Sequence, residues 1–125
     1  MRYLLLIYSD ESQRAPMTEE ESATGYQRWA DYTNWLVEKR WMRAGDALQP
    51  TDQATSVIVR GSERVVTDGP FAETKEQLGG FYMIEVDNLD DAIEAAARCP
   101  GAELGTMEVR PIAEFNLAEG ANSGQ

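Results

Sequence analysis

The heptapeptide RYLLLIY, Arg2 to Tyr8, is predicted to form the first β-strand of the fold. As a β-strand it carries apolar side chains on both faces, because successive residues point to opposite sides. One face has Tyr3, Leu5 and Ile7, and the other has Leu4, Leu6 and Tyr8. Such a strand needs cover on both faces. In a chain of 125 residues, helices can cover one face, and a second copy of the chain could cover the other.

The segments after this strand predict an α+β fold. A first helix begins after Thr18, which has capping-box spacing to Glu21, and should run to about Arg43, ending before Gly45. If the hairpin of residues 55–68 is set aside, the predicted elements follow the βαββαβ order of a ferredoxin-like domain. The other predicted elements are a strand over 46–48, a hairpin of strands 55–60 and 63–68 joined by Gly61-Ser62, a strand over 80–86, a helix over 89–98 capped by Asn88, and a strand over 106–112.

The last predicted strand indicates how the two faces of the sheet differ. Met107 and Val109 point one way, which we assign to the helices. Glu108 and Arg110 then point to the face that the helices leave uncovered. Two charges on that face suggest a partly polar cavity, closed by the sheet of a second subunit.

The long helix has one broad apolar face on a 100° wheel, with a tryptophan outside it. Trp35 falls in the polar arc, where it could pack under a loop or form a subunit contact. We interpret the following residues as the face of the helix that packs on the sheet: Tyr26, Trp29, Ala30, Thr33, Leu36, Val37 and Trp41.

Charge and composition exclude several classes of protein. The chain has 11 Lys and Arg against 22 Asp and Glu, a formal charge of −11, which argues against nucleic-acid and membrane-surface partners. It contains no histidine, and its one cysteine, Cys99, permits neither an internal disulfide nor a thiolate cluster. The carboxylates show no calcium-loop or helical metal-ligand spacing. We therefore predict neither a metal nor another cofactor.

The chain is expected to form one soluble cytoplasmic domain. Its first apolar run, Tyr3 to Tyr8, is shorter than the core of a signal peptide, and no run reaches membrane-spanning length. The predicted domain covers residues 1–113. Residues 114–125, rich in Gly, Ala, Asn and Ser, read as a mobile tail.

One segment, DGPFAETKE at residues 68–76, is not explained by composition or periodicity. On this motif and its surroundings, the sequence resembles the YCII-related proteins, in the branch named after the Asp-Gly-Pro-Phe motif. The resemblance extends over nearly the whole chain, and the matching order of segments makes it specific. These segments are the opening strand 1–8, the motif 68–76, Gly79-Gly80-Phe81-Tyr82, residues 87–98, Cys99-Pro100-Gly101 and residues 108–111.

The resemblance implies a ferredoxin-like fold that pairs sheet to sheet into a dimeric α/β barrel. It also implies a cleft of enzymatic appearance, although the activity of the family is largely unassigned. Better understood relatives are thought to use a His–Asp pair for acid–base chemistry on small, often aromatic, compounds. This chain has no histidine, so only an aspartate, Asp68, could match that pair. Members of this branch tend to accompany extracytoplasmic-function sigma factors, which implies a regulatory alternative.

Asp68 has two interpretations. As a turn former, it would accept hydrogen bonds from backbone N–H groups just downstream, beside Gly69 and Pro70, while Phe71 anchors the loop to the core. As a candidate catalytic base, it would lie at a strand end beside the cleft, where burial could raise its pKa. Residues 73–76, with Glu73, Lys75 and Glu76, form either a solvated charge cluster or a clamp over the cleft.

Four further residues are candidates for the cleft. Arg110 could form a buried pair with Glu108, or present its guanidinium to a carboxylate or phenolate ligand. Tyr8 and Tyr82 could donate hydrogen bonds to the same ligand, or be core residues with one satisfied hydroxyl group. Cys99, at a helix end before Pro100, is predicted to have a structural role and not a reactive thiol.

Three functional hypotheses follow. The first is a cofactor-free enzyme that performs lyase or isomerase chemistry on a small organic molecule in the cleft of a homodimer. The second is a small-molecule binder without catalysis. The third is an interaction module whose acidic surface meets a basic region of a sigma factor. A cavity lined by Asp68, Arg110 and tyrosines would favour the first two.

Overall fold

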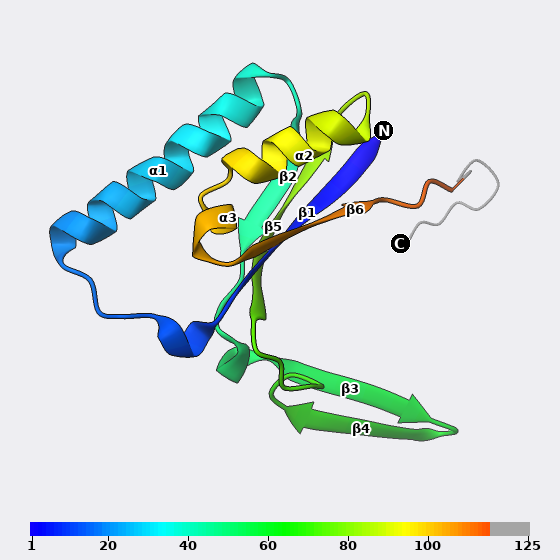
Figure 1. Cartoon of the computed structure of the whole chain (residues 1–125). Coiled ribbons are helices and arrows are strands. Elements are labelled where there is room, and N and C mark those ends of the chain that lie inside the picture. Colours follow the sequence, from blue (N-terminus) through cyan, green and yellow to red (C-terminus); the bar gives the residue numbers. More distant parts are fainter. Residues whose placement is uncertain (116–125) are drawn as a thin grey trace.

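The computed structural model of the chain describes residues 1–115. It contains one four-stranded antiparallel sheet, in which β1 pairs with both β5 and β6, and β5 also pairs with β2. The strand order is β2-β5-β1-β6, so the apolar opening strand lies inside the sheet (Figure 1). The strands of this sheet are β1 (Arg2–Ser9), β2 (Met42–Ala47), β5 (Gln77–Glu85) and β6 (Thr106–Pro111).

The helices cover only one face of this sheet, as Figure 1 shows. They are α1 (Glu19–Glu38), α2 (Leu89–Arg98) and α3 (Gly101–Leu104). Short 3₁₀ helices, η1 (Glu11–Gln13) and η2 (Thr51–Gln53), lie in the connections. The element order and the sheet order together are consistent with a ferredoxin-like α+β fold. Within residues 1–115, no helix is long and apolar enough to cross a membrane.

The core lies between the sheet and the helices. Leu5, Leu36, Ile84 and Cys99 are its largest fully buried side chains. Burying each such aliphatic side chain contributes about 1.5–3 kcal/mol of hydrophobic stabilisation. Leu6, on the opposite side of β1, is also buried, at 9 % exposed, but it does not belong to this core cluster. The opening strand is therefore apolar on both faces, as the sequence predicted, but among residues 1–115 the helices cover only one of them.

The predicted hairpin is confirmed, with β3 at Thr55–Arg60 and β4 at Glu63–Asp68. It forms a separate two-stranded sheet that projects from the body of the molecule (Figure 1). Both faces are exposed: Val57 and Val66 pair on one face, and Ile58 and Val65 pair on the other. The backbone closes at the base of the hairpin, where Gly69 N donates to Ala54 O at 2.7 Å.

The first helix ends earlier than predicted, at Glu38 rather than near Arg43. Its start is confirmed, since Thr18 and Glu21 form the capping box. The helix ends in a Schellman motif, in which Trp41 N donates to Leu36 O at 3.0 Å and Arg40 has a φ of 64°. The residues that follow form β2, which begins at Met42 instead of at the predicted residue 46.

The buried face of α1 is narrower than predicted. Tyr26 and Val37 are 77 % and 55 % exposed, because the sheet contacts a stripe centred on Tyr32 and Leu36, the two buried residues of the helix. The Tyr32 hydroxyl donates to Ala95 O on α2 at 2.7 Å, which joins the two helices. Trp35 packs against the ring of Tyr32 and against that of Trp41, which lies in the connection between α1 and β2.

The C-terminal tail, predicted over residues 114–125, is described only at its start. Glu114 forms an exposed ion pair with Arg2 at 3.1 Å. Residues 116–125 lie outside the described part of the chain, so their predicted mobility stays a prediction.

Candidate functional site

The sheet face that the helices leave bare, here called the open face, gathers three of the predicted site residues. Met107 and Val109 pack against the core, so the alternation of β6 directs Glu108 and Arg110 to the open face. In the register of the sheet, Glu108 lies opposite Leu6 and Arg110 opposite Leu4. Tyr8 lies on the same face of β1, two residues beyond Leu6.

Glu108 and Arg110 both influence the Tyr8 hydroxyl in this group. Burial raises the pKa of the Tyr8 hydroxyl above its ordinary value, and the hydrogen bond and negative charge of Glu108 raise it further. The positive charge of Arg110 acts in the opposite direction and lowers this pKa. Tyr8 is therefore a protonated donor beside a carboxylate, with a guanidinium group near both.

The predicted buried pair of Glu108 and Arg110 does not form. Both side chains are exposed, and within residues 1–115 neither takes part in an ion pair. The reason is that residues 1–115 provide no cover for the two charges on this face, so both stay in contact with water. Within residues 1–115 the N–H donors of the Arg110 guanidinium have no hydrogen-bond partner, so they can bind another group.

The structure places Tyr82 on the opposite, helix-covered face. Tyr82 and Thr33 share a hydrogen bond between their hydroxyl groups at 2.7 Å, and the ring packs edge-on against Tyr32. Burial raises its pKa. Of the two interpretations of Tyr82, a core residue with one satisfied hydroxyl is the one that the contacts support.

Asp68 lies at the end of β4, on the projecting hairpin, and is exposed. Within residues 1–115 its carboxylate accepts no hydrogen bond, so neither the predicted turn bonds nor burial is present. Gly69 does adopt the backbone conformation expected of it, with a φ of 97°. Phe71 is 90 % exposed and does not anchor the loop to the core, contrary to the prediction.

The motif loop lines a hollow of about 460 Å³ at the end of β1. Glu11 fixes its opposite wall, because its carboxylate accepts hydrogen bonds from Thr51 Oγ1 at 2.8 Å and from Thr51 N. Glu73 and Lys75 both line this hollow. Both side chains are exposed, which agrees with a solvated charge cluster.

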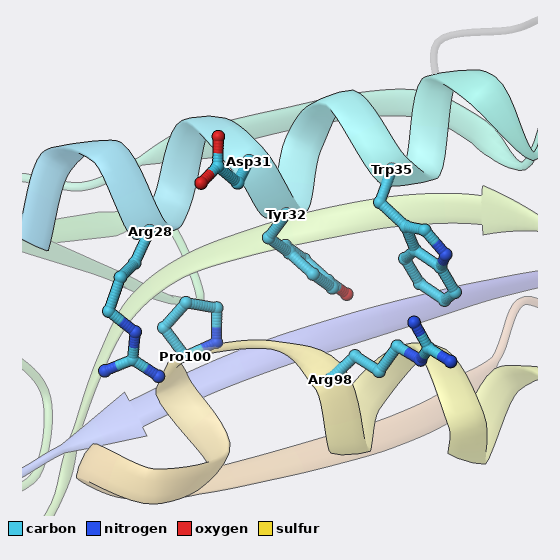
Figure 2. A pocket seen from close by; sticks show the side chains of 6 residues that line it. All are labelled: Arg28, Asp31, Tyr32, Trp35, Arg98 and Pro100. Carbon is cyan, nitrogen blue, oxygen red and sulfur yellow. The ribbon is translucent and has the colours of Figure 1, made fainter.

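Sequence reasoning missed a second hollow, a groove of about 350 Å³ between α1 and α2 (Figure 2). The tryptophan in the polar arc of α1 was its one signal, since Trp35 lines this groove. The Arg98 guanidinium lies 4.6 Å from the centre of the Trp35 ring. The lining residues are Arg28, Asp31, Tyr32, Trp35, Arg98 and Pro100.

Cys99 is a core residue. The side chain is 1 % exposed, and burial raises the pKa of its thiol to about 11. A thiol kept neutral in this way is a poor nucleophile and a poor metal ligand. Among residues 1–115, no three Asp, Glu or Cys side chains gather closely enough to hold a metal ion.

Two comparisons with known proteins agree with the resemblance seen in the sequence. The profile of the YCII-related domain matches residues 1–116. An uncharacterised protein of Rhizobium meliloti (strain 1021) is 36 % identical over 126 residues, which covers 95 % of this chain and 98 % of that protein. On this evidence the chain belongs to the YCII-related domain family.

Proposed function

We propose that two copies of the chain associate through their open faces into a dimeric α/β barrel. We further propose that the enclosed site performs acid–base chemistry on a small organic molecule, with neither a metal nor another cofactor. The observation that carries this proposal is the group formed by Tyr8, Glu108 and Arg110 on a sheet face without cover.

The composition of the open face supports a second copy as its cover. Its centre is apolar, and its margins carry both signs of charge, with Arg2 and Arg110 against Asp46 and Glu108. A two-fold interface brings the same surface against itself, so it needs both signs on one face. A chain with a formal charge of −11 would otherwise repel its own copy. The apolar centre consists of Leu4, Leu6, Phe81 and Met83.

The proposed chemistry uses one group for each role. Glu108 accepts a proton from the substrate, and Tyr8 donates a hydrogen bond to the oxygen on which negative charge develops. Arg110 anchors a carboxylate or phenolate of the substrate through two parallel hydrogen bonds. The substrate class is therefore a small acid with an apolar body, and the reaction is a lyase- or isomerase-type proton transfer. Asp68 is left out because it projects on the exposed hairpin.

Sedimentation at micromolar concentration tests the association. We expect the wild-type chain to be a dimer and Leu4→Asp to be a monomer, because association would remove the new carboxylate from water, a cost that pairing with the opposite Arg110 only partly offsets. Leu104→Asp is the matched control, since Leu104 is 66 % exposed on the helix side. A wild-type monomer, or a dimer that tolerates Leu4→Asp, would contradict the proposal.

Proton exchange in D₂O tests the chemistry. A panel of aromatic and aliphatic keto acids is incubated with the protein, and NMR records deuterium entering the carbon next to the carbonyl group. We expect Glu108→Gln to reduce the exchange rate by about 100-fold or more. Tyr82→Phe, which changes a tyrosine on the covered face, should keep the rate. Saturable binding without exchange would favour a non-catalytic binder. A dimer that binds none of these compounds would favour the third hypothesis, an interaction module that binds a sigma factor, over both an enzyme and a small-molecule binder.

A further inference from the structure

We propose that the groove between α1 and α2 binds a small dicarboxylate, with a guanidinium group at each end and an apolar floor between them. The groove lies on the helix side, away from the open face, so it stays accessible in the proposed dimer. The inference does not depend on the proposed function, because it uses none of the residues of the open face.

The two arginines are placed at opposite ends of the groove. Arg28 stands on α1 two helical turns before Trp35, a separation of about 10 Å along the helix axis. Arg98 ends α2, and its guanidinium lies against the Trp35 ring. Figure 2 shows the Arg28 side chain directed towards Pro100 and the Arg98 side chain beneath Trp35.

Both guanidinium groups have donors to spare. Arg98 Nε contacts Glu94 at 2.7 Å and Arg28 Nη2 contacts Glu103 at 3.1 Å, and each arginine engages this one glutamate among residues 1–115. A guanidinium group has five N–H donors, so most of them remain available. Both pairs are exposed, and exposed ion pairs hold their partners weakly. A ligand carboxylate can therefore bind beside each glutamate or replace it.

The floor between the arginines offers apolar surface. The Tyr32 hydroxyl is already bound to Ala95 O at 2.7 Å, and Tyr32, at 5 % exposed, and the buried Pro100 close the bottom of the groove, so the half-buried Trp35 is the apolar ring that the groove exposes. Asp31 is the one acidic residue among those lining the groove. Its carboxylate accepts a hydrogen bond from Gln27 at 2.8 Å and points away from both guanidinium groups in Figure 2. The groove therefore suits a flat apolar body with an acidic group at each end.

Charge and size select the ligand class. A chain with a formal charge of −11 repels anions over most of its surface, and at the groove an anionic ligand has to compete with Glu94 and Glu103 for the two guanidinium groups. A volume of about 350 Å³ accommodates a small molecule. A rigid dicarboxylate can reach both guanidinium groups at once, whereas a monocarboxylate can pair with only one.

Titration of the full chain with terephthalate, followed by ¹H–¹⁵N NMR, tests this site. We expect saturable shifts of the Trp35 indole N–H and the Arg98 Nε–H. Arg28→Gln and Arg98→Gln should each raise the Kd by about tenfold or more, since each removes one charged hydrogen-bonding group. Arg43→Gln is the matched control, because Arg43 pairs with Glu85 outside the groove, and it should leave the Kd unchanged.

Two ligand controls and one variant complete the experiment. Benzoate should bind about tenfold more weakly than terephthalate, and neutral terephthalamide should give no saturable shift. Leu4→Asp should keep the affinity for terephthalate, so a failure of the dimer proposal would not affect this test. The inference is overturned if terephthalate gives no saturable shift, if neither groove variant weakens binding, or if terephthalamide binds as tightly as terephthalate.

Discussion

The two faces of the four-stranded sheet differ in how far their apolar side chains are shielded from water. On the covered face, α1, α2 and α3 exclude water from Leu5, which is fully buried. On the open face, the neighbouring Leu4 is only half-buried and lies opposite the charged Arg110. The same strand supplies both residues. The difference shows that the chain completes its own core on one side and leaves the apolar centre of the other side partly exposed to water.

The largest expected effect separates these two leucines. Leu5→Ala should lower the free energy of unfolding by about 3 kcal/mol, because it leaves a cavity in a packed core. Leu4→Ala should lower it by less than about 1 kcal/mol at low protein concentration, since the side chain is already partly hydrated. Urea denaturation of both variants measures the difference. Equal effects would contradict the difference between the two faces, whereas a Leu4→Ala effect that grows with protein concentration would indicate that a second copy covers Leu4.

The covered face should also make the protein sensitive to alkali. The pKa of Cys99 is raised from 9.0 to about 11 in the folded chain, so its thiol ionises more readily after unfolding. The stability due to the neutral thiol is complete below pH 9 and is lost as the pH rises towards 11. We expect a loss of about 2 kcal/mol over this range. Urea unfolding at each pH should show a shallower decline for Cys99→Ala, and an unchanged decline would contradict this assignment.

The smallest effect is expected outside both faces, on the projecting hairpin. Asp68→Asn should change the free energy of unfolding by less than about 0.5 kcal/mol, because the side chain is exposed and holds no hydrogen bond within residues 1–115. Thermal melting measures this directly. A loss of 1 kcal/mol or more would restore the interpretation of Asp68 as a turn former. A variant that melts normally but loses proton exchange would restore its interpretation as a base.

Local chemistry made the hairpin predictable and one helix end unpredictable. β-Branched runs on both sides of Gly61-Ser62 define β3 and β4 without reference to the rest of the chain. The Schellman motif that ends α1 usually has glycine at its left-handed position, but this chain has Arg40 there. The nearest glycine is Gly45, and the helix was therefore predicted to extend into the region that forms β2.

In the candidate site, too, only the features that depend on local sequence could be predicted. Glu108 and Arg110 were predictable because they alternate with apolar neighbours on β6. Tyr82 lies in a run that is apolar at every position, so its face depends on the register in which it pairs with Leu5. The arginines of the α1–α2 groove come from segments far apart in the chain. Only the packing of the two helices brings them together, and no local pattern encodes that packing.

The position of β1 within the sheet has a consequence for the synthesis of the protein. The ribosome makes this strand well before its partners β5 and β6, in which Met83 and Arg110 pair with Leu4. At roughly 5–20 residues per second, several seconds pass before the first partner is complete. During that time a strand that is apolar on both faces has no partner from its own chain. The segment that organises the finished sheet is thus the one that most needs shielding by chaperones while the chain is made.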